Sequence, residues 1–211
     1  ENILNEKLMK KSELEESLNW KLDKPYAIVT FHPVTLEGND SRNQIEALLA
    51  ACASRQDMKF IFTKANADAS GRIINQMIDE YVDKSENAIA YTSLGLGRYL
   101  SALKHCTMVI GNSSSGLLEA PSFGVPTINI GDRQKGRLQA DSVINCMPET
   151  TSIIEAIERA LQKDVQIKAR KVVNPYGDGQ TSKKVVNTIK EFLLSDKVDL
   201  KKSFYDCVGG K

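Results

Sequence analysis

Three consecutive serines, Ser113 to Ser115, lie between Gly111 and Gly116, where an apolar run changes into a helix-forming run. Hydroxyls and the free N–H groups of a helix N-terminus can bind a phosphate without adding a full positive charge. Glu119 follows Ser115 by four residues and therefore lies on the same helical face. A carboxylate one turn deeper can accept hydrogen bonds from ribose hydroxyls. The pattern favours a nucleotide site over the alternative, a single N-cap serine with filler residues.

Two further segments carry side chains suited to phosphate chemistry. His32 directly follows an apolar run and could act as an acid, a base or a phosphate donor near neutral pH, although a purely structural imidazole fits equally well. Arg133 and Arg137 in "GDRQKGR" could clamp a phosphate or a base, but an exposed basic loop explains them nearly as well. Spacing alone does not decide between these readings.

The segment "KANADAS" contains Asn66 and Asp68. These residues fit an ordinary Asx turn followed by a helix cap at Ser70, and spacing alone favours that interpretation.

Composition excludes several classes of protein. Lys and Arg total 28 and Asp and Glu total 27, which gives a net charge of +1. A chain with so small a net charge has no overall positive potential to attract nucleic acid or an anionic membrane. The four cysteines are scattered singly and only two histidines are present, which argues against a zinc site or a disulfide framework. No apolar stretch approaches the roughly 20 residues needed to cross a bilayer. A reducing, cytoplasmic location fits best.

Short β-prone runs alternate with helical runs along the whole chain. Six runs are brief and almost continuously apolar, as expected of strands buried on both faces: 26–31, 58–63, 87–92, 107–110, 126–130 and 142–146. Strict alternation predicts a parallel sheet with right-handed crossovers, that is, an α/β, Rossmann-like doubly wound fold. Ligands bind such sheets beyond the carboxyl ends of the strands, where the polar residues above are found.

Helices are expected between these strands. Capping-box spacing at Ser12/Glu15 and at Ser41/Gln44 predicts two helix starts. Helical periodicity or composition predicts the others over residues 70–84, 97–105, 114–123, 152–163 and 181–195.

Four segments occur in one order along the chain: "TFHPVT", "NADASG", "GNSSSGLLEAPSFGVPTINIGDRQKGR" and "YGDG". Together they resemble the C-terminal half of the UDP-N-acetylglucosamine 2-epimerases, and more narrowly the hydrolysing branch that serves sialic and legionaminic acid synthesis. The resemblance runs from about Tyr26 to the C-terminal helix. It implies a GT-B arrangement, in which two Rossmann-like domains hold a UDP-sugar in the cleft between them.

The resemblance also implies roles for single residues. Ser113 and Ser114 would hold the diphosphate, and Glu119 would bind the ribose hydroxyls. Asn66 would face the sugar and phosphate, and this role replaces the Asx-turn interpretation of that residue. The backbone around Leu94 would lie at the edge of the uracil ring. The residues expected to bind the UDP-sugar are therefore Asn66, Leu94, Ser113, Ser114, Ser115, Glu119 and Arg133, and the expected catalytic residue is His32, near the phosphate–sugar junction.

The implied reaction is an elimination followed by hydration. A base removes the proton at sugar C2, UDP leaves from C1, and water adds to the resulting glucal to give a free manno-configured amino sugar. Hydroxyls, His32 and an arginine would stabilise the negative charge that develops on the departing diphosphate. No metal or redox cofactor is expected.

By the same resemblance, three regions are expected: a linker and leading helix over residues 1–24, the UDP-binding domain over 25–180, and a helix and tail over 181–211 that cross to an N-terminal domain. That domain would carry the catalytic carboxylates, so the chain alone is expected to be inactive. The expected partners are the UDP-sugar and this N-terminal domain, and homodimer formation stays open. Three alternatives also remain: the donor domain of a GT-B glycosyltransferase, a non-hydrolysing epimerase, and a non-enzymatic nucleotide sensor.

Overall fold

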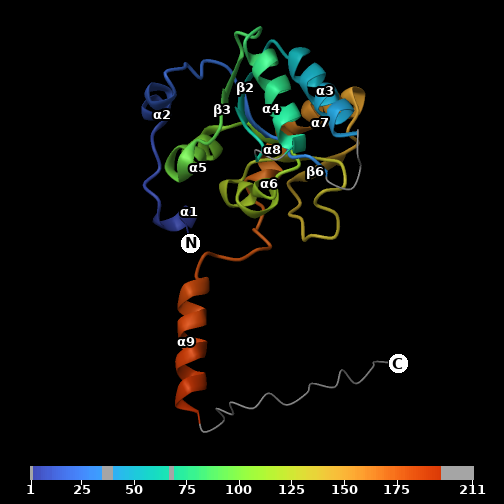
Figure 1. Ribbon diagram of the computed structural model, residues 1–211. Helices are drawn as coiled ribbons and strands as arrows, with labels where there is room; N and C mark the ends of the chain where they lie inside the picture. The colour runs from blue at the N-terminus through green and yellow to red at the C-terminus, as the bar shows by residue number, and fades with distance from the viewer. Residues whose placement is uncertain (1, 35–39, 67–68, 196–211) are drawn as a thin grey trace, which may run out of the picture.

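A six-stranded, wholly parallel sheet forms the centre of the protein, with helices on both faces (Figure 1). The computed structural model describes residues 2–34, 40–66 and 69–195. The strand order is β3-β2-β1-β4-β5-β6, which confirms the predicted α/β doubly wound class. The strands are β1 (Tyr26–Thr30), β2 (Lys59–Thr63), β3 (Ala88–Tyr91), β4 (Met108–Gly111), β5 (Thr127–Ile130) and β6 (Val143–Cys146), in agreement with the six predicted runs.

The register of the strands brings several strand ends to one place. Thr30, the last residue of β1, lies opposite Thr63 of β2 on one side and Gly111 of β4 on the other. Gly111 in turn lies opposite Asn129 of β5. The segments that follow β1, β2, β4 and β5 therefore begin side by side at the carboxyl edge of the sheet, where ligands bind in this class of fold.

Successive residues of each strand point to opposite faces, and each face has its own apolar core. Ala27, Val29 and Phe31 belong to the core beneath α3, α4 and α7, whereas Tyr26 and Ile28 belong to the core beneath α2 and α5. The helices are α1 (Asn2–Asn5), α2 (Lys11–Leu18), α3 (Asp40–Ala53), α4 (Ala69–Val82), α5 (Gly95–His105), α6 (Ser115–Leu118), the 3-10 helix η1 (Ala120–Phe123), α7 (Thr150–Leu161), α8 (Lys163–Ala169) and α9 (Thr181–Leu194).

The helix predicted over residues 114–123 is wrong as a single element. It is divided into α6, one turn long, and η1. Pro121 explains the break, because proline has no N–H to donate and disfavours the α conformation in the residue before it. Gly124, with φ of 66°, ends the segment in a left-handed conformation.

Both predicted helix starts are wrong by two residues. α2 begins at Lys11, and the Glu13 carboxylate accepts a hydrogen bond from the Lys10 N–H at 2.7 Å. Glu15 instead accepts from the Leu22 N–H at 2.6 Å, which fixes the chain after the helix. α3 begins at Asp40, so Ser41 lies inside the helix rather than before it.

The C-terminal helix α9 projects away from the domain (Figure 1). None of its residues is buried, and its apolar side chains include Phe192, which is 53% exposed, and Leu193, which is 65% exposed. The remainder of the predicted region, beyond residue 195, lies outside the described residues. α8, between α7 and the segment leading to α9, was not predicted. In the described part of the chain, no helix combines the length and apolarity that a membrane span requires.

Candidate functional site

Asn112 ties the end of β1 to the beginning of the serine turn. Its side chain is buried, with only 1% of the residue exposed. Its Oδ1 accepts a hydrogen bond from the His32 N–H at 2.7 Å, and its Nδ2 donates to the His32 carbonyl at 2.8 Å. Because both bonds go to the backbone of one residue, Asn112 sets the position of His32 beside the serines. Sequence reasoning missed Asn112, although it stands inside the "GNSSSG" motif.

The two glycines around the serines serve packing inside the protein. A Cβ on Gly111 would lie 1.9 Å from the Thr30 carbonyl oxygen, and its φ of 133° disfavours any side chain. A Cβ on Gly116 would lie 2.5 Å from Cγ2 of Thr127, whose hydroxyl donates to the Gly116 carbonyl at 2.8 Å. The close approach at Gly116 is therefore to β5, which holds α6 against the sheet.

The three serines are half-buried at the start of α6. The Ser113 hydroxyl accepts a hydrogen bond from the Ser115 N–H at 3.3 Å, and the Ser115 hydroxyl is hydrogen-bonded to the phenol of Tyr99. α6 is only one turn long, so its dipole is smaller than that of the longer helix that was predicted. The polarity of this turn comes mainly from its hydroxyl and amide groups.

Glu119 lies at the junction of α6 and η1, one turn after Ser115. The residue is half-buried, and its Oε2 is buried without a hydrogen-bond partner in the described part of the protein. Burial raises the pKa of the Glu119 carboxyl, and a hydrogen bond from the Ser115 hydroxyl partly opposes this rise. A buried acceptor without a partner costs free energy in the folded state.

Arg133 reaches the same turn from the loop after β5. Its guanidinium donates to the Asn112 carbonyl at 3.0 Å, and Gln134, which is buried, donates to the same oxygen at 2.7 Å. Partial burial lowers the pKa of Arg133, and the charge of Arg137 lowers it further. Part of each arginine side chain remains exposed to solvent. The loop "GDRQKGR" thus places positive charge next to the serine turn.

The other two predicted binding residues lie at neighbouring strand ends. Asn66 is exposed in the segment after β2. The Leu94 side chain is buried in the core beneath α5, while its carbonyl accepts a hydrogen bond from Nε of Arg98 at 2.9 Å. Asp68 lies outside the described residues. The hydrogen bonds that join the site therefore run through Asn112 to His32 and Arg133. The binding and catalytic roles of all the predicted residues stay predictions.

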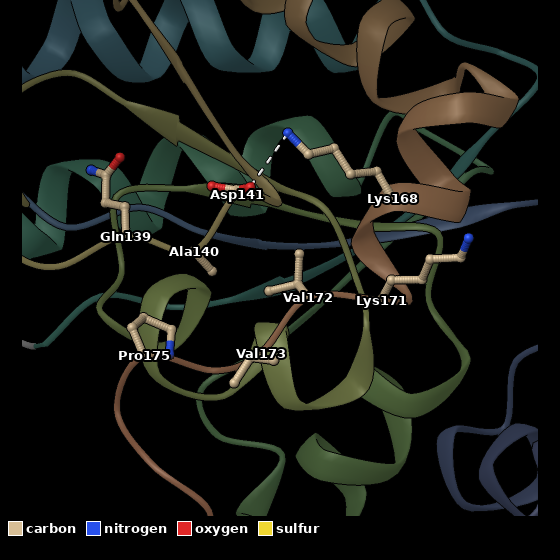
Figure 2. Close-up of a pocket in the computed structure, with 8 residues that line it drawn as sticks. All are labelled: Gln139, Ala140, Asp141, Lys168, Lys171, Val172, Val173 and Pro175. Carbon is tan, nitrogen blue, oxygen red and sulfur yellow. Dashed lines mark ion pairs between the residues drawn. The ribbon is translucent and has the colours of Figure 1, made fainter.

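A separate cavity of about 440 Å³ lies near the carboxyl end of α8 (Figure 2). Lys168 and Asp141 form an ion pair of 3.6 Å at this cavity. None of the predicted site residues lines it. Among the side chains of the described residues, no group of three His, Cys, Asp or Glu residues is arranged to hold a metal ion.

The sequence matches the family model described as UDP-N-acetylglucosamine 2-epimerase over residues 1–190. It is 38% identical over 205 residues to a GDP/UDP-N,N'-diacetylbacillosamine 2-epimerase (hydrolyzing) of Campylobacter jejuni, and the match covers 97% of this chain and 53% of that protein. It is also 38% identical over 207 residues to the polysialic acid biosynthesis protein P7 of Escherichia coli, covering 98% of this chain and 52% of that protein. The chain thus spans about half the length of the curated relatives it matches.

A solved structure shares the fold. The S. aureus MnaA–UDP co-structure superimposes with a TM-score of 0.67 at 19% sequence identity, covering 87% of this chain and 49% of that chain. At this identity the superposition supports the fold class only.

Proposed function

Since this chain belongs to the UDP-N-acetylglucosamine 2-epimerase family, we propose that it is the UDP-binding half of a hydrolysing UDP-HexNAc 2-epimerase. The proposal rests on one observation: a single buried residue joins three of the segments that were predicted to form the site. Asn112 connects the serine turn to His32 through its side chain and to Arg133 through its carbonyl. A structural serine cap would not require a histidine and an arginine at the same place.

In this proposal the serine turn and the arginine bind the diphosphate. The hydroxyls of Ser113 and Ser114 donate to phosphate oxygens, and Arg133 supplies the balancing charge. The guanidinium has five N–H donors, of which one goes to Asn112, so others can reach a phosphate. As the bond between C1 and the diphosphate breaks, negative charge grows on UDP, and these donors stabilise it in place.

Glu119 accepts hydrogen bonds from the ribose hydroxyls in the proposed complex. The position of Glu119 one turn after Ser115, next to the serine turn, supports this role. Asn66 would face the sugar and phosphate, and the backbone around Leu94 would edge the uracil. These two assignments rest on the family resemblance and on positions at the carboxyl edge of the sheet.

His32 would act at the phosphate–sugar junction. The reaction we propose is removal of the C2 proton by a base, loss of UDP from C1 with the bonding electron pair, and addition of water across the new double bond. The products are UDP and a free ManNAc-type sugar. In its protonated form the imidazole would donate to the departing diphosphate. Two hydrogen bonds that fix the His32 backbone beside the serine turn support this role.

The proposed partner of this half is an N-terminal domain of the same protein, which would supply the carboxylates and the opposite wall of the cleft. α9 supports this partner. A helix of this length is only marginally stable alone in water, yet its apolar side chains, including Ile189 and Phe192, are about half exposed. We propose that they pack against that domain. Cys52, Cys106 and Cys146 are free thiols in the described part of the chain, which supports a reducing, cytoplasmic location.

The test is a product assay on the intact gene product. UDP-GlcNAc and its 2,4-diacetamido-trideoxy analogue are supplied separately, and UDP and sugar are followed by chromatography and NMR. Release of UDP with a free manno-configured sugar supports the proposal. Formation of UDP-ManNAc selects the non-hydrolysing alternative, and UDP release that depends on an added acceptor selects a glycosyltransferase. Absence of UDP release from every UDP-HexNAc refutes the assignment.

A further inference from the structure

The "YGDG" segment is the one quoted motif to which the proposed function gives no role. Tyr176, its first residue, and Asn174, just before it, bond back to the domain ahead of α9. Nδ2 of Asn174 donates to the Leu118 carbonyl of α6 at 2.8 Å and to the Ser122 hydroxyl of η1 at 2.7 Å. The Tyr176 phenol donates to the Leu138 carbonyl, in the loop after β5, at 3.0 Å. The segment therefore contacts both chain regions that the proposed function assigns to UDP.

Asn174 also fixes the backbone from which the Tyr176 phenol extends. Its Oδ1 accepts a hydrogen bond from the Tyr176 N–H at 2.9 Å. Pro175 stands between the two residues and restricts the backbone further, because its ring fixes φ. Pro175 also lines the same cavity as Gln139 of the loop (Figure 2). Tyr176 thus reaches the loop from a segment that is itself fastened to α6 and lies beside the end of the loop.

The loop after β5 is held at its two ends by hydrogen bonds. Its beginning is fastened to the carbonyl of Asn112 in the serine turn. Residues 135–139 are all exposed, so burial does not hold this part of the loop. The Tyr176 phenol donates into this exposed stretch, and Gln139, at its end, accepts from Nδ2 of Asn145 at 2.8 Å. The tyrosine therefore tethers a part of the loop that has little packing of its own.

Two positive charges lie between these attachments. Neither Arg133 nor Arg137 forms an ion pair within the described ranges, whereas Asp132 pairs with Lys135 at 3.6 Å. Partial burial lowers the pKa of Arg133, and the nearby charge of Arg137 lowers it further. Holding two like charges close together costs Coulomb energy, which an anion beside both would recover. The tethered loop is therefore suited to an anion that carries more than one charge.

We propose that Arg137 is a second cation for the diphosphate of UDP, and that Tyr176 is a positioning residue that places it by holding the carbonyl of the next residue, Leu138. The inference rests on the proposed function and adds two residues to its diphosphate site. One guanidinium does not balance a diphosphate, which carries more than one negative charge, and Arg133 already donates one N–H to Asn112. A loop tethered before the ligand arrives loses less free energy to ordering on binding.

A double-mutant cycle on the intact gene product tests both residues. Calorimetry measures the dissociation constant of UDP for the native protein, Tyr176→Phe, Arg137→Ala and the double variant. Arg137→Ala removes a charge-assisted hydrogen bond and should weaken UDP binding about tenfold or more. Tyr176→Phe should weaken it about three- to fivefold in the native background but less than about 1.5-fold in Arg137→Ala, because the tyrosine acts through the arginine.

Two further variants separate positioning from general destabilisation. The Tyr26 phenol also donates to a backbone carbonyl, that of Ala102 at 2.7 Å, but Tyr26 begins β1 and so lies at the opposite edge of the sheet. Tyr26→Phe should bind UDP as the native protein does, even where it lowers Tm. Arg137→Lys retains the charge without the planar fork of donors and should recover part of the affinity that Arg137→Ala loses.

The outcomes are distinct. Failure of the native protein to bind UDP overturns the proposed function itself. UDP binding that Arg137→Ala leaves unchanged overturns the inference and leaves the proposed function standing, and it does so even where Tyr176→Phe fails to fold. No loss in Tyr176→Phe, or an equal loss in both backgrounds, overturns the positioning role. A comparable loss in Tyr26→Phe overturns that role as well, because the effect would then be one of general destabilisation.

Discussion

Replacing Asn112 by alanine tests whether one buried amide holds the candidate site together. In the native protein its side chain makes hydrogen bonds of 2.7 and 2.8 Å to the two peptide groups of His32. Asn112→Ala removes both bonds and leaves a small polar space. Solvent has little access to this space, because only 1% of Asn112 is exposed in the native protein. Water therefore replaces the lost partners poorly. We expect the variant to fold with a lower free energy of unfolding.

The expected loss follows from the two bonds and their burial. Removing one partner of a buried hydrogen bond costs about 1–3 kcal/mol, so the two bonds of Asn112 together contribute about 2–6 kcal/mol. For a chain of this size each kcal/mol corresponds to about 2–4 °C in Tm, which gives a decrease of about 4–24 °C.

Asn75 provides a matched control. Its Oδ1 accepts from the Ala65 N–H at 2.8 Å and its Nδ2 donates to the Ala65 carbonyl at 3.0 Å, so it forms the same pair of bonds after β2. Asn75 is only half-buried, so water can enter the space that Asn75→Ala leaves. We expect this variant to lose about 1–2 kcal/mol.

Urea and thermal unfolding of the native chain and both variants, followed by circular dichroism, measure the two losses. The reasoning predicts that Asn112→Ala loses clearly more than Asn75→Ala. Equal losses, or a larger loss for Asn75→Ala, would show that burial does not set the strength of these bonds.

Two other predictions concern Glu119 and the packing of Gly116. Because burial raises the pKa of Glu119 in the fold, its ionisation destabilises the native state above that pKa and has no effect below the ordinary value of 4.5. Glu119→Gln should therefore raise Tm by about 2–4 °C at pH 7 and by much less at pH 4, while weakening UDP binding; an equal rise at both pH values would contradict this. Gly116→Ala brings a methyl against Cγ2 of Thr127 and should cost about 1–3 kcal/mol. Adding Thr127→Ser deletes that methyl and keeps the hydroxyl, so urea titration should show most of the loss recovered; no recovery would show that the contact is not the cause.

Local patterns were sufficient for the sheet and for the outline of the site. Six apolar runs separated by helical segments predict a parallel sheet, because only strands buried on both faces are apolar throughout. The "GNSSSG" turn and "GDRQKGR" follow two of these strands, so they must lie at the carboxyl edge in any right-handed α/β sheet. Motif order then led to the family, which the sequence comparison supports.

Contacts between distant residues were decided only by the tertiary structure. Asn112 and His32 are 80 residues apart, and their pairing depends on β1 lying next to β4 in register. Tyr99 and Ser115 meet because α5 and α6 pack on the same face of the sheet, which no spacing along the chain reveals. Side-chain partners depend on strand order and on the pleat, which depend in turn on the whole sheet. Local sequence therefore determines which groups reach the edge of the sheet, and the fold determines which of them touch.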